Sequence, residues 1–136
     1  VVKEIEGESL DSLYTRKRYT KVRKEHYETV VQGMRQAVLG GTCRGANLPD
    51  IEVCGKTGTA QNRGKDHSAF MGFAPMNEPK IAVSVYVENG GWGATYGVPI
   101  GALIMEKYLK GNLSIESEAK ALEIQKRRID YGIHER

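Results

Sequence analysis

The residues best suited to chemistry lie in one short segment, Gly55-Lys56-Thr57-Gly58-Thr59-Ala60-Gln61. A Gly-Lys-Thr run occurs in phosphate-binding loops, which read G-x-x-x-x-G-K-[ST] and lead from a strand into a helix at the Lys. That pattern needs a glycine at position 50, but this chain has Asp50, whose carboxylate would repel a phosphate. Gly, Thr, Asn and Gln follow Lys56 and do not predict a helix there. We therefore reject the phosphate loop.

A strand edge beside a cleft suits the same segment better, as in the Lys-Thr-Gly strand of penicillin-recognising serine enzymes. There Lys56 supplies a fixed positive charge, and the hydroxyl of Thr57 can hold a substrate carboxylate. Gly58 lets an acyl group lie along the strand, and the next backbone N–H can face a developing oxyanion. A three-residue motif such as Lys-Thr-Gly often occurs by chance, so the surrounding sequence has to show whether it marks such a site.

The pattern of apolar residues predicts three strands around this segment, over residues 51–60, 67–74 and 80–88. The third alternates most clearly, since Ile81 and Val83 would point to one face and Ala82 and Ser84 to the other. The links between the strands are short, which favours an antiparallel meander over parallel crossovers.

Two helices are predicted beside these strands. Over residues 25–39, the apolar residues recur at helical spacing, and Gly40-Gly41 ends the helix. Over residues 98–110, an apolar face broad enough to pack on a sheet precedes Gly111. The fold class is therefore α+β, a three-stranded antiparallel sheet with flanking helices packed against it.

The chain divides into a polar connector (1–24), a folded portion (25–111) and a charged helical tail (112–136). We expect a short strand near Leu13–Tyr19 in the connector. The tail is expected to be a solvated helix with two ion pairs at i,i+4 spacing and a thin apolar edge. The pairs are Glu116/Lys120 and Glu123/Arg127, and the edge is formed by Leu122 and Ile129.

Composition excludes several other classes. With 136 residues, 40% hydrophobic and 27% charged, the chain is too apolar for a disordered segment and has the length of one domain. The net charge of +3 is too small to indicate a nucleic-acid partner by itself. The alternative function is a nucleic-acid-binding module using residues 16–24, which hold six basic residues but only Tyr19 as an interleaved aromatic.

Two further groups of residues could carry chemistry. Cys43 and Cys54 have no metal-type CxxC spacing and are either two buried thiols or, in an oxidising compartment, a disulfide. Asp66-His67-Ser68 cannot form a triad, because adjacent side chains of a strand point to opposite faces. His67 could still support the adjacent strand near the site.

The flanking sequence decides the meaning of the Lys-Thr-Gly segment. Over roughly residues 25–110 the chain resembles the class B penicillin-binding proteins, closely their elongation-type members. Beyond the segment itself, the matching stretches keep the family's order and spacing: Gly33-Met34, Gly41-Thr42, Asp66–Phe70, Gly72–Pro75, the strand Ile81–Val87, and Glu88–Gly91.

The resemblance implies a fragment of the penicillin-binding-protein transpeptidase fold, which cross-links peptidoglycan stem peptides by serine acyl transfer. By carry-over, Lys56 lines the active site and helps hold the donor carboxylate and the proton network. Thr57 and Thr59 would hydrogen-bond the carboxylate of a stem peptide or a β-lactam. The N–H of Thr59 would complete the oxyanion hole, and Gly58 would allow the close approach.

The chain departs from the family where the nucleophile should be. No S-x-x-K precedes Lys56, and S-x-N occurs nowhere. The S-x-x-K of Ser117–Lys120 lies in the charged tail, where we expect solvent-facing neighbours rather than the desolvated Lys that activation requires. We therefore expect the C-terminal portion of a transpeptidase domain, inactive alone.

The resemblance also implies partners and a compartment. Stem peptides, β-lactams and the cell-wall elongation machinery are the expected partners, with no nucleic acid. No metal or organic cofactor is implied. The compartment would be the periplasm, in a protein anchored in the inner membrane. A complete domain should have about five strands, so missing strands would leave an exposed sheet edge or apolar face through which this chain could self-associate.

Overall fold

The computed structural model describes Gly7, Arg16 and residues 19–131. Its elements are the helix α2 (Lys24–Leu39), the 3₁₀ turn η1 (Arg44–Ala46), the strands β1 (Cys54–Ala60), β2 (His67–Ala74) and β3 (Ile81–Val87), and the helices α3 (Gly97–Lys110) and α4 (Ile115–Lys126). The strand expected near Leu13–Tyr19 and most of the 1–24 connector lie outside the described residues. No helix in the described part is long and apolar enough to cross a membrane.

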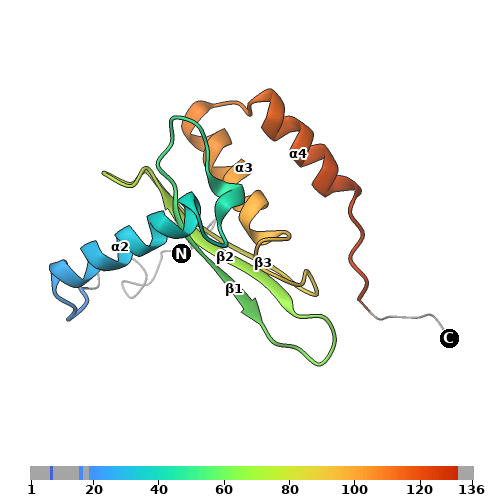
Figure 1. The fold of residues 1–136 in the computed structure, drawn as a ribbon, viewed down its shortest axis with the longest axis horizontal. Coiled ribbons are helices and arrows are strands. Elements are labelled where there is room, and N and C mark those ends of the chain that lie inside the picture. The colour runs from blue at the N-terminus through green and yellow to red at the C-terminus, as the bar shows by residue number, and fades with distance from the viewer. Residues whose placement is uncertain (1–6, 8–15, 17–18, 132–136) are drawn as a thin grey trace.

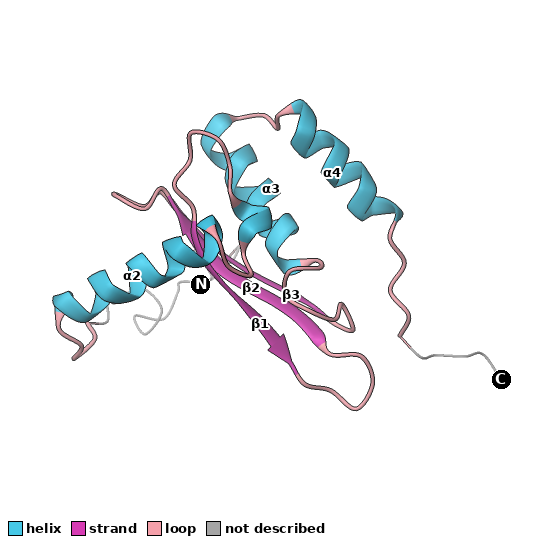
Figure 2. Cartoon of the chain, in the orientation of Figure 1, coloured by secondary structure: helices cyan, strands magenta, loops and turns pink. Residues whose placement is uncertain are grey.

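The three strands form one antiparallel sheet in the order β1-β2-β3, which confirms the predicted meander and the α+β class. The register places Thr57 opposite Phe70 and Thr59 opposite Ser68. Figure 2 shows the sheet with α3 and α4 on one side and α2 crossing near one end of β1. β1 is therefore an edge strand, and its outer side has no strand partner in the described chain.

The core lies between the sheet and α3, around the ring of Phe70, which is 2% exposed. A methyl group at Gly55 or Gly101 would come within 2.5 Å of the ring, and one at Gly72 within 2.7 Å. The ring therefore occupies space that exists because three neighbouring backbones lack a Cβ atom. Other members of this core come from α3, the end of α2 and the segment before β1, namely Val98, Ala102, Met105, Val38 and Val53.

The opposite face of the sheet is much more open. Met71, which follows Phe70 on β2, is 59% exposed, and Tyr86 on β3 is exposed beside it. The helix α2 begins one residue before the predicted start and ends where predicted, but it projects beyond the sheet (Figure 1), and Val38 is its one fully buried side chain. Its outer apolar residue Val30 is 58% exposed. The expectation that this apolar face packs on the sheet holds only for its C-terminal end.

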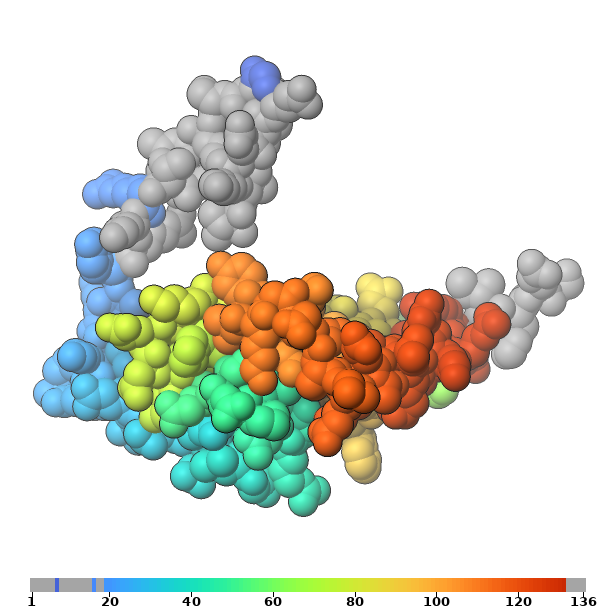
Figure 3. Space-filling model, turned by 90° about the horizontal axis from the view of Figure 1, so that it is seen from above, coloured from blue at the N-terminus to red at the C-terminus, as the bar shows by residue number. Residues whose placement is uncertain are grey.

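The tail forms the predicted helix, α4, which packs beside α3 (Figure 1). The Glu123–Arg127 ion pair is present at 2.8 Å, whereas Glu116 and Lys120 form no pair. The side turned toward the protein is made by Ser117, which is buried, and by the half-buried Ala121 and Ile124 rather than by Leu122, which is exposed. Figure 3 shows the residues of α3 and α4, orange to red, as one continuous surface.

Candidate active site

Thr57 and Thr59 lie on the free-edge strand β1, on the side of the sheet that α3 covers. Together with Thr42 and the loop residues 92–94 they line a pocket of about 250 Å³. The hydroxyls of Thr42 and Thr57 are hydrogen-bonded, with 2.7 Å between their Oγ1 atoms. Three hydroxyls thus converge at one edge of the sheet, an arrangement suited to holding a carboxylate.

The loop between β3 and α3 is held over this edge by close contacts. A Cβ atom on Gly93 would lie 2.7 Å from the carbonyl oxygen of Gly58 and 2.9 Å from Cβ of Thr57, so only glycine fits there. The buried hydroxyl of Ser68 donates to the Trp92 carbonyl (2.8 Å) and accepts from the Gly97 N–H (3.0 Å). Because Ser68 sits on β2, these bonds tie the start of the loop at Trp92 and the first residue of α3, Gly97, to the strand next to β1.

Lys56 lies on the other face of β1 from the two threonines, as strand alternation requires. Its side chain is exposed, and Nζ donates to the Thr57 carbonyl at 2.9 Å. The pocket of about 250 Å³ is lined by Thr57 and Thr59 and not by Lys56. In the described residues, the Lys56 charge acts on the neighbouring thiol of Cys43 instead.

Cys43 and Cys54 are both buried and both free, so the structure has two thiols rather than a disulfide. Burial raises the pKa of Cys43, although hydrogen bonds with Thr42 and Thr57 and the charge of Lys56 act in the opposite direction. Burial likewise raises the pKa of Cys54. Neither thiol is therefore prepared to act as a nucleophile at neutral pH.

His67 and Ser68 point to opposite faces of β2 and serve different contacts. Nδ1 of His67 accepts from the N–H of Asn89 at 3.0 Å, and its ring lies 5.3 Å from that of Tyr86. The ring thus contacts β3 and the residue just after it. Ser68 is occupied by the loop, so Asp66, His67 and Ser68 do not converge on one reacting atom.

The S-x-x-K of the tail is not arranged for catalysis either. Ser117 itself is 4% exposed because it packs toward Glu106 of α3, although its neighbours Glu116 and Glu118 are exposed as expected. Lys120 is also exposed, and it lines a groove beside Ala94 and Thr95. None of the residues that line the pocket at Thr57 and Thr59 is a serine. In the described chain, no group of three His, Cys, Asp or Glu side chains could hold a metal ion.

Comparison with known proteins decides between a transpeptidase site and the other interpretations of the β1 edge. A family model described as the penicillin binding protein transpeptidase domain matches residues 1–109. The chain belongs to this family. The match includes the first 24 residues, which the sequence resemblance covered only loosely, and ends before α4.

Relatives and solved structures agree with the family. The chain is 34% identical over 87 residues to the peptidoglycan D,D-transpeptidase MrdA of Acinetobacter baumannii, covering 52% of this chain and 13% of the relative. It is 37% identical over 75 residues to PbpA of Mycobacterium tuberculosis, covering 47% and 15%. The Pseudomonas aeruginosa PBP2 structure in complex with WCK 5153 matches with 40% identity and a TM-score of 0.55, over 66% of this chain and 21% of that one. This chain therefore spans a small part of the transpeptidases it matches, and no match supports a nucleic-acid-binding module.

Within this transpeptidase fragment, sequence reasoning assigned no role to Thr42 or to Trp92. A signal for Thr42 was present, since Gly41-Thr42 belongs to the family-like stretches. The pattern of the loop showed only that it was irregular. Its position over β1 depends on Ser68 and Gly58, which are distant in sequence.

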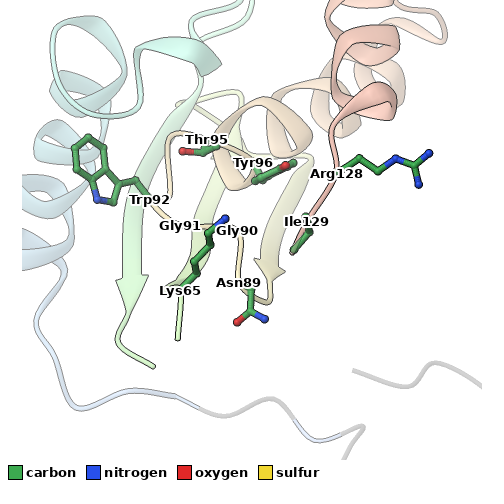
Figure 4. Close-up of a pocket in the computed structure, with 9 residues that line it drawn as sticks. All are labelled: Lys65, Asn89, Gly90, Gly91, Trp92, Thr95, Tyr96, Arg128 and Ile129. Carbon is green, nitrogen blue, oxygen red and sulfur yellow. The ribbon is translucent and has the colours of Figure 1, made fainter. Parts of the chain in front are cut away.

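A second cavity, of about 400 Å³, lies on the other side of Trp92 in this transpeptidase fragment (Figure 4). Its lining comes from the β1–β2 turn, the loop and the segment after α4, and comprises Lys65, Asn89, Gly90, Gly91, Trp92, Thr95, Tyr96, Arg128 and Ile129. Figure 4 shows the Lys65 side chain reaching toward Gly90 and Gly91 and the Arg128 side chain pointing away from them, so the two cations do not converge. We assign no ligand to this cavity.

Proposed function

We propose that the protein containing this chain is a peptidoglycan D,D-transpeptidase acting by serine acyl transfer, and that this chain forms the Lys-Thr-Gly side of its active site. The observation that carries this is the pocket in which Thr42, Thr57 and Thr59 converge at the free edge of β1, under a loop fixed by Ser68. The family and the relatives named as D,D-transpeptidases support it.

The residues of this edge have distinct roles in the proposed reaction. The hydroxyls of Thr57 and Thr59 hold the terminal carboxylate of a stem peptide or a β-lactam. Because β1 has no strand partner on its outer side among the described residues, a peptide can lie along it, and Gly58 offers no side chain to obstruct it. The N–H of Thr59 donates to the oxyanion that develops on the attacked carbonyl.

The nucleophile has to come from residues outside this chain. Its serine oxygen attacks the carbonyl of the penultimate D-Ala, terminal D-Ala leaves, and an amine of a neighbouring strand takes the acyl group. Lys56 adds positive charge from the other face of β1 and, through its bond to the Thr57 carbonyl, fixes the strand beside the carboxylate. This route needs no metal or organic cofactor.

Covalent labelling with a fluorescent penicillin tests the proposal. We expect the intact protein to be labelled and the 136-residue chain to remain unlabelled. Replacing Thr59 by Val in the intact protein should lower the acylation rate by about tenfold to a hundredfold, because a hydrogen bond to a charged group contributes about 1.5–3 kcal/mol. Thr29→Val on the exposed side of α2 is the matched control and should leave the rate unchanged. Labelling of the isolated chain, or none of the intact protein, would contradict the proposal.

We further propose a periplasmic site on an inner-membrane-anchored protein that works with the cell-wall elongation machinery, because the relatives named MrdA and PbpA act on peptidoglycan. The solved relatives include β-lactam acyl-enzyme complexes, which supports β-lactams as ligands. For the isolated chain we propose self-association through the open sheet face around Met71 and Tyr86. A monodisperse monomer in analytical ultracentrifugation would count against self-association.

A further inference from the structure

We propose that α4 and the residue after it form an intramolecular strap that positions the loop 92–96 over the active-site edge of β1, with Arg127 as the positioning residue. The inference rests on the proposed function of the pocket at Thr57 and Thr59. It goes beyond that function because the strap lies outside residues 1–109, the part that matches the family model.

The first end of the strap is anchored on a buried charge. Glu106 of α3 is 0% exposed, and it faces the start of α4 at Ser114 and Ser117, with Lys110 Nζ 3.8 Å away. Neither carboxylate oxygen has a hydrogen-bond partner of ordinary geometry in the described chain. A negative charge beside a helix N-terminus is favourable, so the carboxylate holds α4 by its first turn.

The second end of the strap contacts the loop directly. Arg127 follows the last residue of α4, and its guanidinium donates one hydrogen bond to the Thr95 carbonyl and another to Glu123, the latter at 2.8 Å. The guanidinium carbon also lies 5.4 Å from the centre of the Tyr96 ring. One planar group thus makes three contacts at once, two of them to the loop.

The two halves of the loop are held differently. Ser68 and the β1 backbone fix Trp92 and Gly93, and Ser68 also accepts a hydrogen bond from the N–H of Gly97, the first residue of α3, where the second half ends. Thr95, by contrast, has one hydrogen bond within the loop, from its N–H to the Trp92 carbonyl, and one from outside, from Arg127. A groove of about 420 Å³ separates this half of the loop from α4, so polar contact rather than close packing restrains it.

The restrained half adjoins the proposed reaction site, because Ala94 lines the pocket of Thr57 and Thr59. Release of Thr95 would let Ala94 shift, while Trp92 stays bonded to Ser68 and the threonines stay fixed on β1. We therefore expect loss of Arg127 to slow the acylation step more than it weakens the preceding non-covalent binding, which depends on the carboxylate.

The test uses the intact protein and separates these two steps. Stopped-flow measurements with a fluorescent penicillin give the affinity of the first complex and the rate constant of acylation. We expect Arg127→Ala to lower the acylation rate constant by roughly threefold to tenfold, with less than about a twofold change in affinity. Arg127→Lys keeps the charge but not the planar fork, so it should recover less than half of the loss.

The adjacent arginine is the matched control. Arg128→Ala removes the same charge one residue away, but in the described chain Arg128 makes no hydrogen bond, ion pair or ring contact with the loop, so its kinetics should equal those of the wild type. Hydrogen exchange of peptides spanning residues 92–97 gives a readout independent of activity. It should accelerate in Arg127→Ala and not in Arg128→Ala, with the β2 peptide as the internal reference.

The outcomes distinguish the strap from the proposed function. Unchanged acylation and loop exchange in Arg127→Ala would overturn the strap, as would equal losses in the two alanine variants, which would indicate net charge alone. If Arg127→Ala fails to fold, Glu123→Gln, which removes the ion-pair partner of Arg127, should show a smaller acceleration of exchange in the same peptides, and no acceleration there would also overturn the strap. If wild-type protein takes no penicillin, the proposed function fails, while the exchange measurements still decide whether Arg127 restrains the loop.

Discussion

The helices α2 and α3 look alike in sequence and behave differently in the structure. Both show an apolar face at helical spacing, and both begin one residue before the predicted start. On α3 that face is buried against the sheet, with Val98, Ala102 and Met105 all in the core. On α2 only Val38 is fully buried, and the apolar residues toward its N-terminus face solvent.

The difference shows what the helical spacing of apolar residues can and cannot predict. It shows that a helix has a face that gains free energy by burial, but not where the covering residues are. For α3 they are in this chain, in the strands that surround Phe70. For α2 we expect them outside it, since the chain spans 13% of MrdA and 15% of PbpA.

The largest predicted effect is a difference in stability between substitutions on the two faces of the sheet. Phe70→Ala removes a ring that is 2% exposed and should lower the free energy of unfolding by about 3–5 kcal/mol. Met71→Ala, one residue along β2 and 59% exposed, should cost less than about 0.5 kcal/mol in this chain. Urea unfolding followed by circular dichroism measures both. Equal losses would show that the α3 side is not the core.

The same glycine substitution on each helix tests the contrast directly. Gly101→Ala places a methyl group 2.5 Å from the Phe70 ring and should destabilise the protein by about 1–3 kcal/mol. Gly33→Ala meets nothing within 4 Å, so helix propensity should stabilise this chain by about 0.5–1 kcal/mol.

In the intact protein, the change in stability caused by Gly33→Ala tests whether α2 has a partner. If residues outside this chain cover α2, the added methyl group meets them, and the gain shrinks or becomes a loss. A full gain in the intact protein would contradict the view that α2 has a partner elsewhere.

Local patterns predicted the elements well because their causes are local. The strand alternation of β3 and the ends of both helices at glycines follow from residues that are neighbours in sequence. The same alternation correctly excluded a triad of Asp66, His67 and Ser68. The same alternation places Lys56 and Thr57 on opposite faces of β1, so their side chains do not both line the pocket.

Contacts between distant residues account for what sequence reasoning missed. The loop over β1 depends on Ser68, 24 residues from Trp92, and the strap depends on Arg127, 32 residues from Thr95. Ser117 lies among charged, exposed residues of its own helix, yet contact with Glu106 of α3 buries it. A single sequence contains no signal for such pairs, since their spacing follows no regular period.

The smallest predicted effect concerns the buried carboxylate of Glu106, which lies between α3 and the start of α4. The helix α2 has no buried charge of this kind. Burial by itself would raise the pKa of Glu106, but the polar groups of Ser117 and Ser114 and the charge of Lys110 outweigh it, and the pKa lies below the ordinary 4.5. The folded protein therefore favours the charged form more than the unfolded chain does. The resulting stabilisation is present above pH 4.5 and is lost as the pH falls through the lower folded pKa.

Glu106→Gln removes that titration while keeping the size of the side chain. In thermal unfolding from pH 7 to below 4.5, we expect the wild type to lose stability toward acid more steeply than Glu106→Gln. The control Glu88→Gln changes an exposed carboxylate outside the helices and should run parallel to the wild type. Parallel curves for all three proteins would mean that Glu106 gains nothing from α4 when charged. The first turn of α4 would then be held by packing alone, and the buried side of α3 would differ from that of α2 only in its apolar contacts.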